Sequence, residues 1–493
     1  MSRPLIFEIS SSGRCAASLP GVDVPRAELP EGLVRDDLPL PEVSEGDLIR
    51  HYTRLSRLNF GVDTGFYPLG SCTMKHNPKI NEAVARLPGI TDIHPYQPLE
   101  TVQGALFIAY TLQEFLKEIG GFAGVSLQPA AGAHGELAGV LMMRAYHLDR
   151  GETKRDTILV PDSAHGTNPA STSMSGLKVV EIPSDARGDV DLESLTAACE
   201  EHSDRLVGMM LTNPNTLGLF EKQVEAVCAV VHKHGGLMYG DGANMNALLG
   251  IARPGDLGFD VLHYNLHKTF STPHGGGGPG SGPVGAADRL VDFLPGPIVG
   301  LAADRAEEDV PFFELVTPAR TIGRVKSFYG HFGVMVKAYT YIRMLGTRGL
   351  RRVAEHAVLN ANYLRERLQG TYPVSHDRAC MHEFVLAGPP KDIRDKDVHT
   401  MDIAKRLMDY GFHPPTVYFP LIVEEALMIE PTETESKDTL DAFADALLAI
   451  VKEARENPEL LHQAPHTAPT RRLDEVKAAR DLVLRWRPMD EGA

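Results

Sequence analysis

The sequence predicts an α/β fold with a doubly wound, mainly parallel sheet and a smaller C-terminal α+β domain. Short apolar strands alternate with helical segments between residues 125 and 265, a pattern that requires parallel strands joined by crossover helices. Several of these strands end in polar residues. Because the carboxyl ends of parallel strands meet at one edge of a sheet, this edge is where α/β proteins bind ligands. The expected strands are 125–129, 157–160, 179–182, 206–211, 237–239 and the apolar residues before Lys268; the expected helices of this region are 102–119, 130–146 and 224–234.

Composition excludes two classes of protein. No apolar run among the 493 residues is long enough to cross a bilayer, and the formal charge of −16 opposes binding to nucleic acid. The N-terminus lacks the apolar segment of a signal peptide, so a cytoplasmic protein is expected. Five scattered cysteines without metal-ligand spacing predict reduced thiols and no metal site.

We expect four regions along the chain. Residues 1–75 form a proline-rich arm, with a helix at 48–58, and an active-site loop; residues 76–335 form the large domain; residues 336–455 form the small domain; and residues 456–493 form an extension. A long helix starting at Thr321 and running through Leu345 is expected to link the two domains. The extension either covers a partner or is solvated and disordered.

A strand-to-helix turn offers a phosphate site. The small residues Ala130–Gly135 begin a helix, so its first N–H groups lie open at the positive end of the helix dipole. By itself this pattern is equally typical of an ordinary turn.

Polar residues at other strand ends complete a candidate site. His165 can stack on a flat ring, and Asp241 can pair with the protonated nitrogen of a pyridine ring. Lys268 follows an apolar strand and His267, and it precedes the glycine run 275–278. A lysine with a lowered pKa can form a Schiff base there, although a solvated lysine on a flexible loop is the alternative. The convergence of these strand ends on one crevice favours the site.

Two irregular segments have an ambiguous composition. Gly65–Asn77 gathers glycines, hydroxyls and a lysine, and Ile93–Pro98 is similar. Such loops often line a site, but surface turns have the same composition.

Seven motifs together resemble one enzyme family. They are Gly70–Lys75 (GSCTMK), Gly132–Glu136 (GAHGE), Asp162–Pro169 (DSAHGTNP), Leu211–Thr216 (LTNPNT), Gly240–Asn244 (GDGAN), Asn265–Phe270 (NLHKTF) and Thr321–Val325 (TIGRV). With these motifs the sequence resembles the fold-type-I pyridoxal-phosphate enzymes, which have the aspartate-aminotransferase-like fold, and within them the glycine decarboxylases (P-proteins) of the glycine cleavage system. The chain has about half the length of single-chain P-proteins. It therefore resembles the two-subunit form, and because it holds the lysine it is similar to the catalytic subunit, subunit 2.

The resemblance implies roles for individual residues. Lys268 would carry pyridoxal 5'-phosphate as a Schiff base, His165 would stack on the ring, and Asp241 would pair with the ring nitrogen. The resemblance implies cofactor contacts from Gly132, Ala133, His134 and His267 around the phosphate, from Thr212 or Asn213 at the ring hydroxyl, and from Asn244. Asn265 stands where many relatives have serine, which leaves the polar contact at that position open.

The implied reaction is decarboxylation of glycine, with transfer of the aminomethyl group to the lipoyl arm of the H-protein. The implied assembly is an α2β2 heterotetramer with a homologous subunit 1 that lacks the lysine. Glycine selectivity is expected from Ser71, Thr73 and Asn77, because an arginine clamp would stabilise the substrate carboxylate and oppose loss of CO2. Another fold-type-I decarboxylase or aminotransferase, or a non-catalytic scaffold, remains the alternative.

Overall fold

The computed structural model describes residues 4–35, 38, 40–274, 280–305 and 310–485, so the glycine run 275–278 lies outside the described residues. The chain divides into two compact units, Met1–Thr64 and Gly65–Ala493. The four-region division expected from the sequence stays a prediction.

Among its described residues, the first unit contains one helix. Helix α1 spans Glu45–Ser56, and the Ser44 hydroxyl caps it by accepting a hydrogen bond from the Asp47 amide at 3.2 Å. Glu45 and Asp47 lie in the first turn, where their charges favour the helix dipole. The predicted helix at 48–58 is thus confirmed, with a start three residues earlier.

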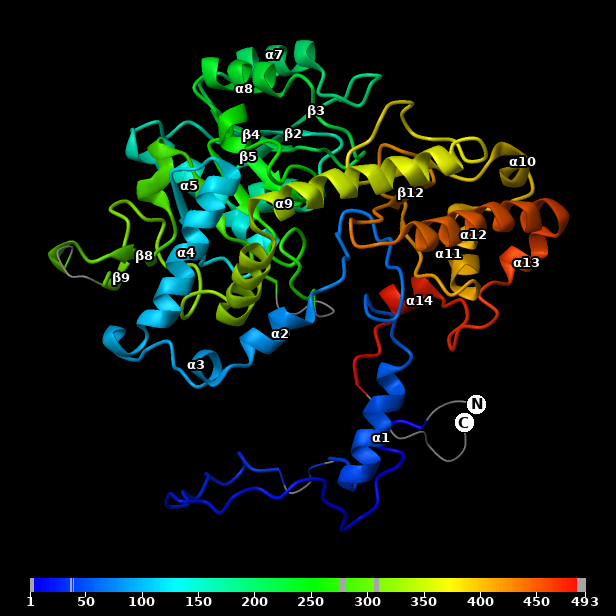
Figure 1. Cartoon of the computed structure of the whole chain (residues 1–493), viewed down its shortest axis with the longest axis horizontal. Coiled ribbons are helices and arrows are strands. Elements are labelled where there is room, and N and C mark those ends of the chain that lie inside the picture. The colour runs from blue at the N-terminus through cyan, green and yellow to red at the C-terminus, as the bar shows by residue number, and fades with distance from the viewer. Residues whose placement is uncertain (1–3, 36–37, 39, 275–279, 306–309, 486–493) are drawn as a thin grey trace. The chain divides into compact units, whose positions relative to one another are not determined.

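A seven-stranded sheet in the order β1-β7-β6-β5-β4-β2-β3 forms the centre of the second unit (Figure 1). Its strands are β1 (Gly124–Ser126), β2 (Thr157–Pro161), β3 (Lys178–Ile182), β4 (Leu206–Thr212), β5 (Leu237–Gly242), β6 (Val261–Tyr264) and β7 (Val284–Ala286). Strands β3, β2, β4, β5 and β6 pair in parallel, whereas β7 runs antiparallel to both β6 and β1. The predicted mainly parallel α/β sheet is confirmed.

Both faces of the sheet are covered by helices, which explains why its central strands are mainly apolar up to their carboxyl ends. Leu159 of β2 packs in a core with α4 (Gln103–Gly120), α7 (Leu192–Glu201), α8 (Val224–Lys233) and part of α9 (Phe332–Leu368). Its neighbours Ile158 and Val160 point to the other face, where they join Met142 and Met143 of α5 (Gly132–Asp149). Strands buried on both faces cannot alternate polar with apolar residues.

A second core lies around a three-stranded antiparallel sheet in the order β10-β12-β11. Its elements are β10 (Phe384–Ala387), β11 (Thr416–Val417), β12 (Ala426–Ile429), α10 (Lys391–Arg394), α11 (Thr400–Asp409), α12 (Lys437–Glu456) and α13 (Pro458–His462). Leu386 and Leu427 of this sheet pack against Phe443 and Leu447 of α12. This C-terminal lobe is the α+β part that the sequence predicts.

The second unit has four further α-helices and a second, two-stranded sheet among its described residues. They are α2 (Lys79–Ala85), α3 (Pro88–Thr91), α6 (Thr167–Met174), α14 (Glu475–Arg480), and the two-stranded sheet of β8 (Ile298–Leu301) and β9 (Phe313–Val316).

The helix predicted to start at Thr321 is wrong at its beginning. Helix α9 starts at Phe332, because Gly323, Phe328 and Gly330 have φ of 98°, 61° and 84°, which no helix accommodates. The helix then continues to Leu368 across a break at Gly346. Apolar spacing could not reveal these left-handed residues.

None of the helices in the described ranges combines the length and apolar content that crossing a bilayer requires. The cytoplasmic location stays a prediction. The five cysteines are unpaired.

Candidate active site

A cavity of about 170 Å³ lies at the carboxyl ends of the central strands. Its lining residues are Ser71, Gly132, Ala133, Glu136, His165, Thr167, Thr212, Thr216, Asp241, Ala243, Asn244, His263, Asn265, His267 and Lys268. Strand β2 ends four residues before His165, β5 contains Asp241, and β6 ends four residues before Lys268. The structure thus brings together the strand ends that the sequence predicts to converge.

The first turn of α5 forms one wall. The side chain of its N-cap residue, Ala131, accepts no hydrogen bond from the first N–H groups of the helix, so it leaves these groups open. Gly132 is needed here, because a Cβ at this position would lie 2.3 Å from Oδ1 of Asn265. This open helix end is suited to an anion.

Asp241 is a buried, oriented carboxylate. It accepts hydrogen bonds from the Ala243 amide at 2.9 Å and from Nδ2 of Asn168 at 3.1 Å, and Nε2 of His263 lies 3.5 Å away. Burial opposes its ionisation, but His263 and these donors outweigh burial and hold the pKa of Asp241 below its usual value. Asp241 therefore offers a fixed negative charge to a positively charged ring nitrogen.

Glu136 is a second buried carboxyl beside Asp241. Nδ2 of Asn168 donates to it at 2.6 Å and thereby connects the two acids. Burial, followed by the charge of Asp241, raises the pKa of Glu136 to about 8. At neutral pH this side chain is a protonated acid, so the pair carries mainly the charge of Asp241.

This arrangement predicts a pH-dependent stability. Because folding raises the pKa of Glu136, its protonated form contributes stability that is complete below its ordinary value of 4.5 and is lost as pH rises through about 8. Glu136→Gln cannot ionise, so between pH 6 and pH 9 the wild type should lose at least about 2 °C of Tm relative to this variant. Thermal unfolding across this range checks the result, with the exposed Glu355→Gln as control. Parallel pH profiles for the wild type and Glu136→Gln would contradict it.

Lys268 is held at the cavity by the loop opposite. Its Nζ donates a hydrogen bond to the backbone oxygen of Ser71 at 2.8 Å. Burial lowers the pKa of His267 to about 3, and the positive charges of Lys268 and His274 act in the same direction. Burial and Lys268 also lower the pKa of His165. Both imidazoles are therefore neutral at pH 7 and free to lie against a ligand without adding positive charge.

Several polar atoms of the site have no hydrogen-bond partner. Oγ1 of Thr212 and Oδ1 of Asn265, in residues that line the cavity, are buried and unpaired, as are Nδ2 of Asn213 and Oδ1 of Asn168, in residues that do not line it. Buried polar atoms are usually paired, so the two unpaired atoms in the cavity wall are suited to bind a polar ligand. The contact that the sequence left open at Asn265 is made by its Nδ2, which lies 3.1 Å from Nε2 of His263.

Not every predicted cofactor residue lines the cavity. His134 accepts a hydrogen bond from the Ala130 amide at 3.1 Å and is absent from the wall, as is Asn213, whose Oδ1 binds the Glu221 amide at 3.0 Å. Thr212 and Asn244 do line it.

Of the predicted substrate residues, only Ser71 lines the cavity. Thr73 is buried behind it, and Asn77 donates to Oγ of Ser271 at 3.1 Å. Residues 93–95 line a separate, mainly apolar cavity of about 270 Å³, not the one that holds Lys268. No arginine is among the described lining residues of the Lys268 cavity.

Sequence reasoning assigned no role to Glu136, Asn168 or His263, which surround Asp241. Glu136 and Asn168 stand inside recognised motifs, so their spacing contained a signal. Nothing in the sequence pattern indicated Glu383, whose carboxylate accepts the Ser71 amide at 2.7 Å.

The chain is similar in sequence to known proteins. A family model described as "Glycine dehydrogenase, C-terminal domain" matches residues 353–466. A protein of Caldanaerobacter subterraneus subsp. tengcongensis named "Probable glycine dehydrogenase (decarboxylating) subunit 2" is 60% identical, over 98% of this chain and 98% of its own. A protein of the same name from Alkaliphilus oremlandii is 58% identical, again over 98% of each chain.

A crystal structure of glycine decarboxylase (P-protein) of the glycine cleavage system, in inhibitor-bound form, has the same fold. Its TM-score is 0.72 at 23% identity, and the match covers 86% of this chain and 93% of that one. A cysteine desulfurase from Thermococcus onnurineus NA1 matches with a TM-score of 0.60 at 16% identity, over 79% and 95% of the two chains.

Fold and site define an α/β enzyme with a lysine, an aspartate and an open helix end in one cavity. The chain belongs to the family of glycine dehydrogenase (decarboxylating) subunit 2. The family resemblance predicted from the seven motifs is confirmed.

Proposed function

We propose that this chain decarboxylates glycine with pyridoxal 5'-phosphate and passes the aminomethyl group to the lipoyl arm of the H-protein. The observation that supports this most is the single cavity shared by Lys268, Asp241, His165 and the start of α5. The names of the relatives give the reaction class, and the cavity contains the residues that this class requires.

The residues present fit the cofactor. The open end of α5 suits a phosphate, the ionised Asp241 suits a pyridine nitrogen, and the unpaired Oγ1 of Thr212 suits a ring hydroxyl. A Cβ at Gly132 would collide with the side chain of Asn265, so the start of α5 stays free of a side chain at this position. When bound, pyridoxal phosphate supplies an electron sink for the electron pair that stays on the α-carbon when CO2 leaves.

Each side chain then has a defined task. Lys268 would hold the cofactor covalently, and Asp241 would keep a proton on the ring nitrogen. His165, neutral because its pKa is lowered, would cover one face of the ring. The absence of arginine from the described cavity wall leaves the glycine carboxylate without a bidentate clamp, so the ground state is not overly stabilised before CO2 departs.

The test is exchange of labelled bicarbonate into the carboxyl group of glycine. It should require the lipoylated carrier and a partner subunit, and the purified protein should show visible absorbance that glycine changes. Efficient transamination without the carrier would contradict the proposal and favour an aminotransferase.

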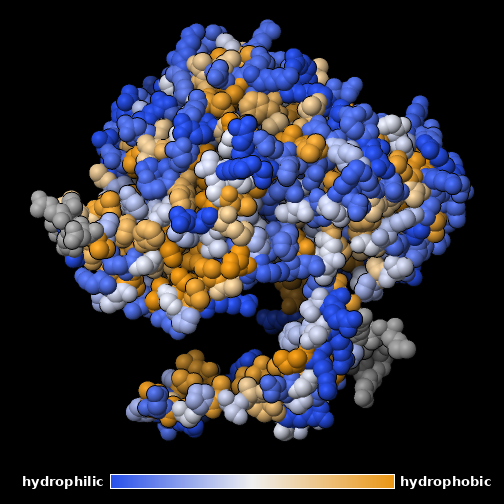
Figure 2. All heavy atoms as spheres, in the orientation of Figure 1, coloured by the Kyte–Doolittle hydropathy of each residue, from blue (hydrophilic) through white to orange (hydrophobic). Residues whose placement is uncertain are grey.

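We predict that the chain works with a homologous subunit 1 in an α2β2 assembly. Within the described part of residues 1–64, Val43 is the sole buried hydrophobic side chain, whereas Leu19, Leu33 and Leu40 are 90%, 75% and 71% exposed. Figure 2 shows hydrophobic residues in orange on the surface of this segment. A segment without its own core gains burial by lying on another chain. The relatives are named as subunit 2, which supports a partner.

Light scattering after size exclusion checks this expectation. The chain mixed with its partner should elute as a heterotetramer, and removal of residues 1–40 should lower the assembled fraction at least about tenfold. A monomer that catalyses exchange fully would contradict the prediction.

A further inference from the structure

The loop opposite Lys268 has an unfavourable backbone. Ser71 and Thr73 have φ of 65° and 48°, in the left-handed region that residues other than glycine rarely enter. A β-branched threonine is especially disfavoured there. Such a conformation persists only where the surroundings hold it in place, and it often occurs at functional sites.

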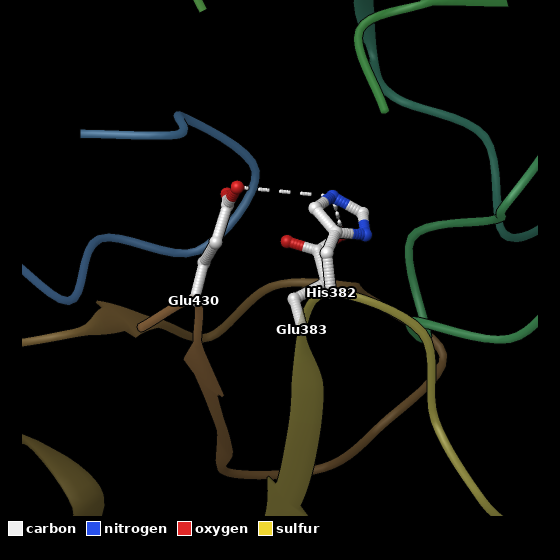
Figure 3. Close-up of side chains that lie close together, drawn as sticks. All are labelled: His382, Glu383 and Glu430. Carbon is white, nitrogen blue, oxygen red and sulfur yellow. Dashed lines mark ion pairs between the residues drawn. The ribbon is translucent and has the colours of Figure 1, made fainter. Parts of the chain in front are cut away.

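Two buried carboxyls of the C-terminal lobe hold this loop. Glu383, which precedes β10, accepts the Ser71 amide at 2.7 Å, and Glu430, which follows β12, accepts the Thr73 amide at 2.8 Å and also the Thr73 hydroxyl. Both glutamates are fully buried. Figure 3 shows Glu383, Glu430 and His382 gathered beside the loop. Three hydrogen bonds to buried acceptors therefore hold the two residues whose backbone is unfavourable.

The loop is also held from the side of the cofactor site. The Ser71 carbonyl oxygen accepts a hydrogen bond from Nζ of Lys268 at 2.8 Å. The backbone of Ser71 therefore binds Glu383 through its N–H group and Lys268 through its oxygen. Further along, the buried Lys75 forms an ion pair with Glu433 at 2.8 Å. The loop therefore connects the C-terminal lobe with the residue at the centre of the site.

The buried side chains of this cluster carry less charge than exposed ones would, so hydrogen bonds are the contacts that hold the loop. Burial raises the pKa of Glu430 to about 7, and burial together with Glu430 raises the pKa of Glu383 well above its usual value. Burial lowers the pKa of His382 to about 3, so this ring is neutral and does not balance the acids. Lys268 and Lys75 are the cations that face the cluster, and Glu433 is the next carboxylate.

A cation site is the rival explanation for this cluster. His382, Glu383 and Glu430 have possible ligand atoms within 4.8 Å of one another. However, the carboxylate oxygens already accept hydrogen bonds: those of Glu430 from Thr73, and those of Glu383 from Ser71 and, at 3.3 Å, from Asn244. A cation would compete with the contacts that hold the loop, so the geometry favours loop positioning.

We propose that Glu383 and Glu430 are positioning residues, which hold Ser71–Thr73 in the backbone conformation that presents the loop to glycine. The inference rests on the proposed function. In a cavity without an arginine among its described lining residues, the loop supplies polar groups of fixed direction, and the two glutamates fix that direction from behind.

The test compares Glu383→Gln and Glu430→Gln with Asp402→Asn. Asp402 is a buried carboxylate of the same lobe, and it accepts a hydrogen bond from the backbone amide of His399 at 2.8 Å. It therefore makes the same kind of contact as the two glutamates, but not with the loop Ser71–Thr73. In the loop variants, KM for glycine in bicarbonate exchange should rise at least tenfold while kcat falls less than threefold. Visible absorbance and borohydride labelling of Lys268 should be retained. The control should change neither quantity.

Hydrogen exchange of a peptide covering residues 68–77 reads the loop directly. It should quicken at least tenfold in both loop variants and not in Asp402→Asn. This readout does not need turnover, so a wild type without exchange activity would defeat the proposed function and leave the loop inference to be decided by deuterium uptake.

Three results would overturn the inference. The first is unchanged hydrogen exchange in folded loop variants. The second is a tenfold loss of kcat in these variants while KM for glycine stays unchanged. The third is one tightly held divalent cation per chain whose removal by a chelator loosens the loop. If a glutamine variant does not fold, Thr73→Val removes the hydroxyl contact from the loop side, and the same increase in KM is expected.

Discussion

Replacing Lys268 by alanine should abolish covalent attachment of the cofactor and lower bicarbonate exchange by about a thousandfold or more, since the group that joins cofactor to protein is removed. The lysine lies in the cavity wall, with its ammonium on the Ser71 carbonyl. Absorbance in the visible range and borohydride labelling measure attachment, and exchange measures turnover.

Lys178→Ala is the control for this variant. Its side chain is 65% exposed and pairs with Asp156 at the surface, so its loss should leave both measurements unchanged. A Lys268→Ala protein that kept the visible absorbance of the wild type would contradict the assignment of Lys268.

The sequence predicted the part of the site that follows from local pattern. Asp241 and His165 stand at or just after the ends of apolar strands, and parallel strands necessarily bring such ends together. The parallel pairing and the convergence of strand ends on Lys268 therefore followed from alternation alone, whereas the order of the strands was not predicted. The identity of the ligand did not, since it depended on the resemblance of whole motifs.

The rest depended on contacts between distant parts of the chain. Glu383 lies 312 residues from Ser71, and Glu430 lies 357 residues from Thr73. In the sequence, Glu383 follows a histidine at the start of a strand and Glu430 follows the end of one, and neither position has a period or spacing that indicates its partner. Such pairs become visible only when the C-terminal lobe is placed against the large sheet.

The start of α9 was predicted wrongly for a different reason. Residues 321–331 carry apolar residues at spacings compatible with a helix, but Gly323 and Gly330 adopt positive φ, and Phe328 does so without being glycine. Only the last of these is unforeseeable from residue type. The two glycines were a signal that the spacing outweighed.

Asp241→Asn should have the second largest effect on the reaction. Asparagine has the same shape and can keep an acceptor for the Ala243 amide, which donates to Asp241 at 2.9 Å, but it has no charge to hold a proton on the ring nitrogen. Without that proton the ring accepts electrons poorly, so exchange should fall by at least about a hundredfold. The side chain is 5% exposed, so solvent cannot replace the missing charge.

The variant separates chemistry from binding. Lys268 is unchanged, so borohydride should still label it, and the affinity for glycine should change less than tenfold while kcat carries the loss. Asn168→Ala offers a graded comparison, because it removes one of the donors to Asp241, at 3.1 Å, and leaves the charge in place. Its kcat should therefore fall between those of the wild type and Asp241→Asn. If Asp241→Asn lost glycine affinity with kcat intact, Asp241 would be part of the substrate pocket and not the partner of the ring nitrogen.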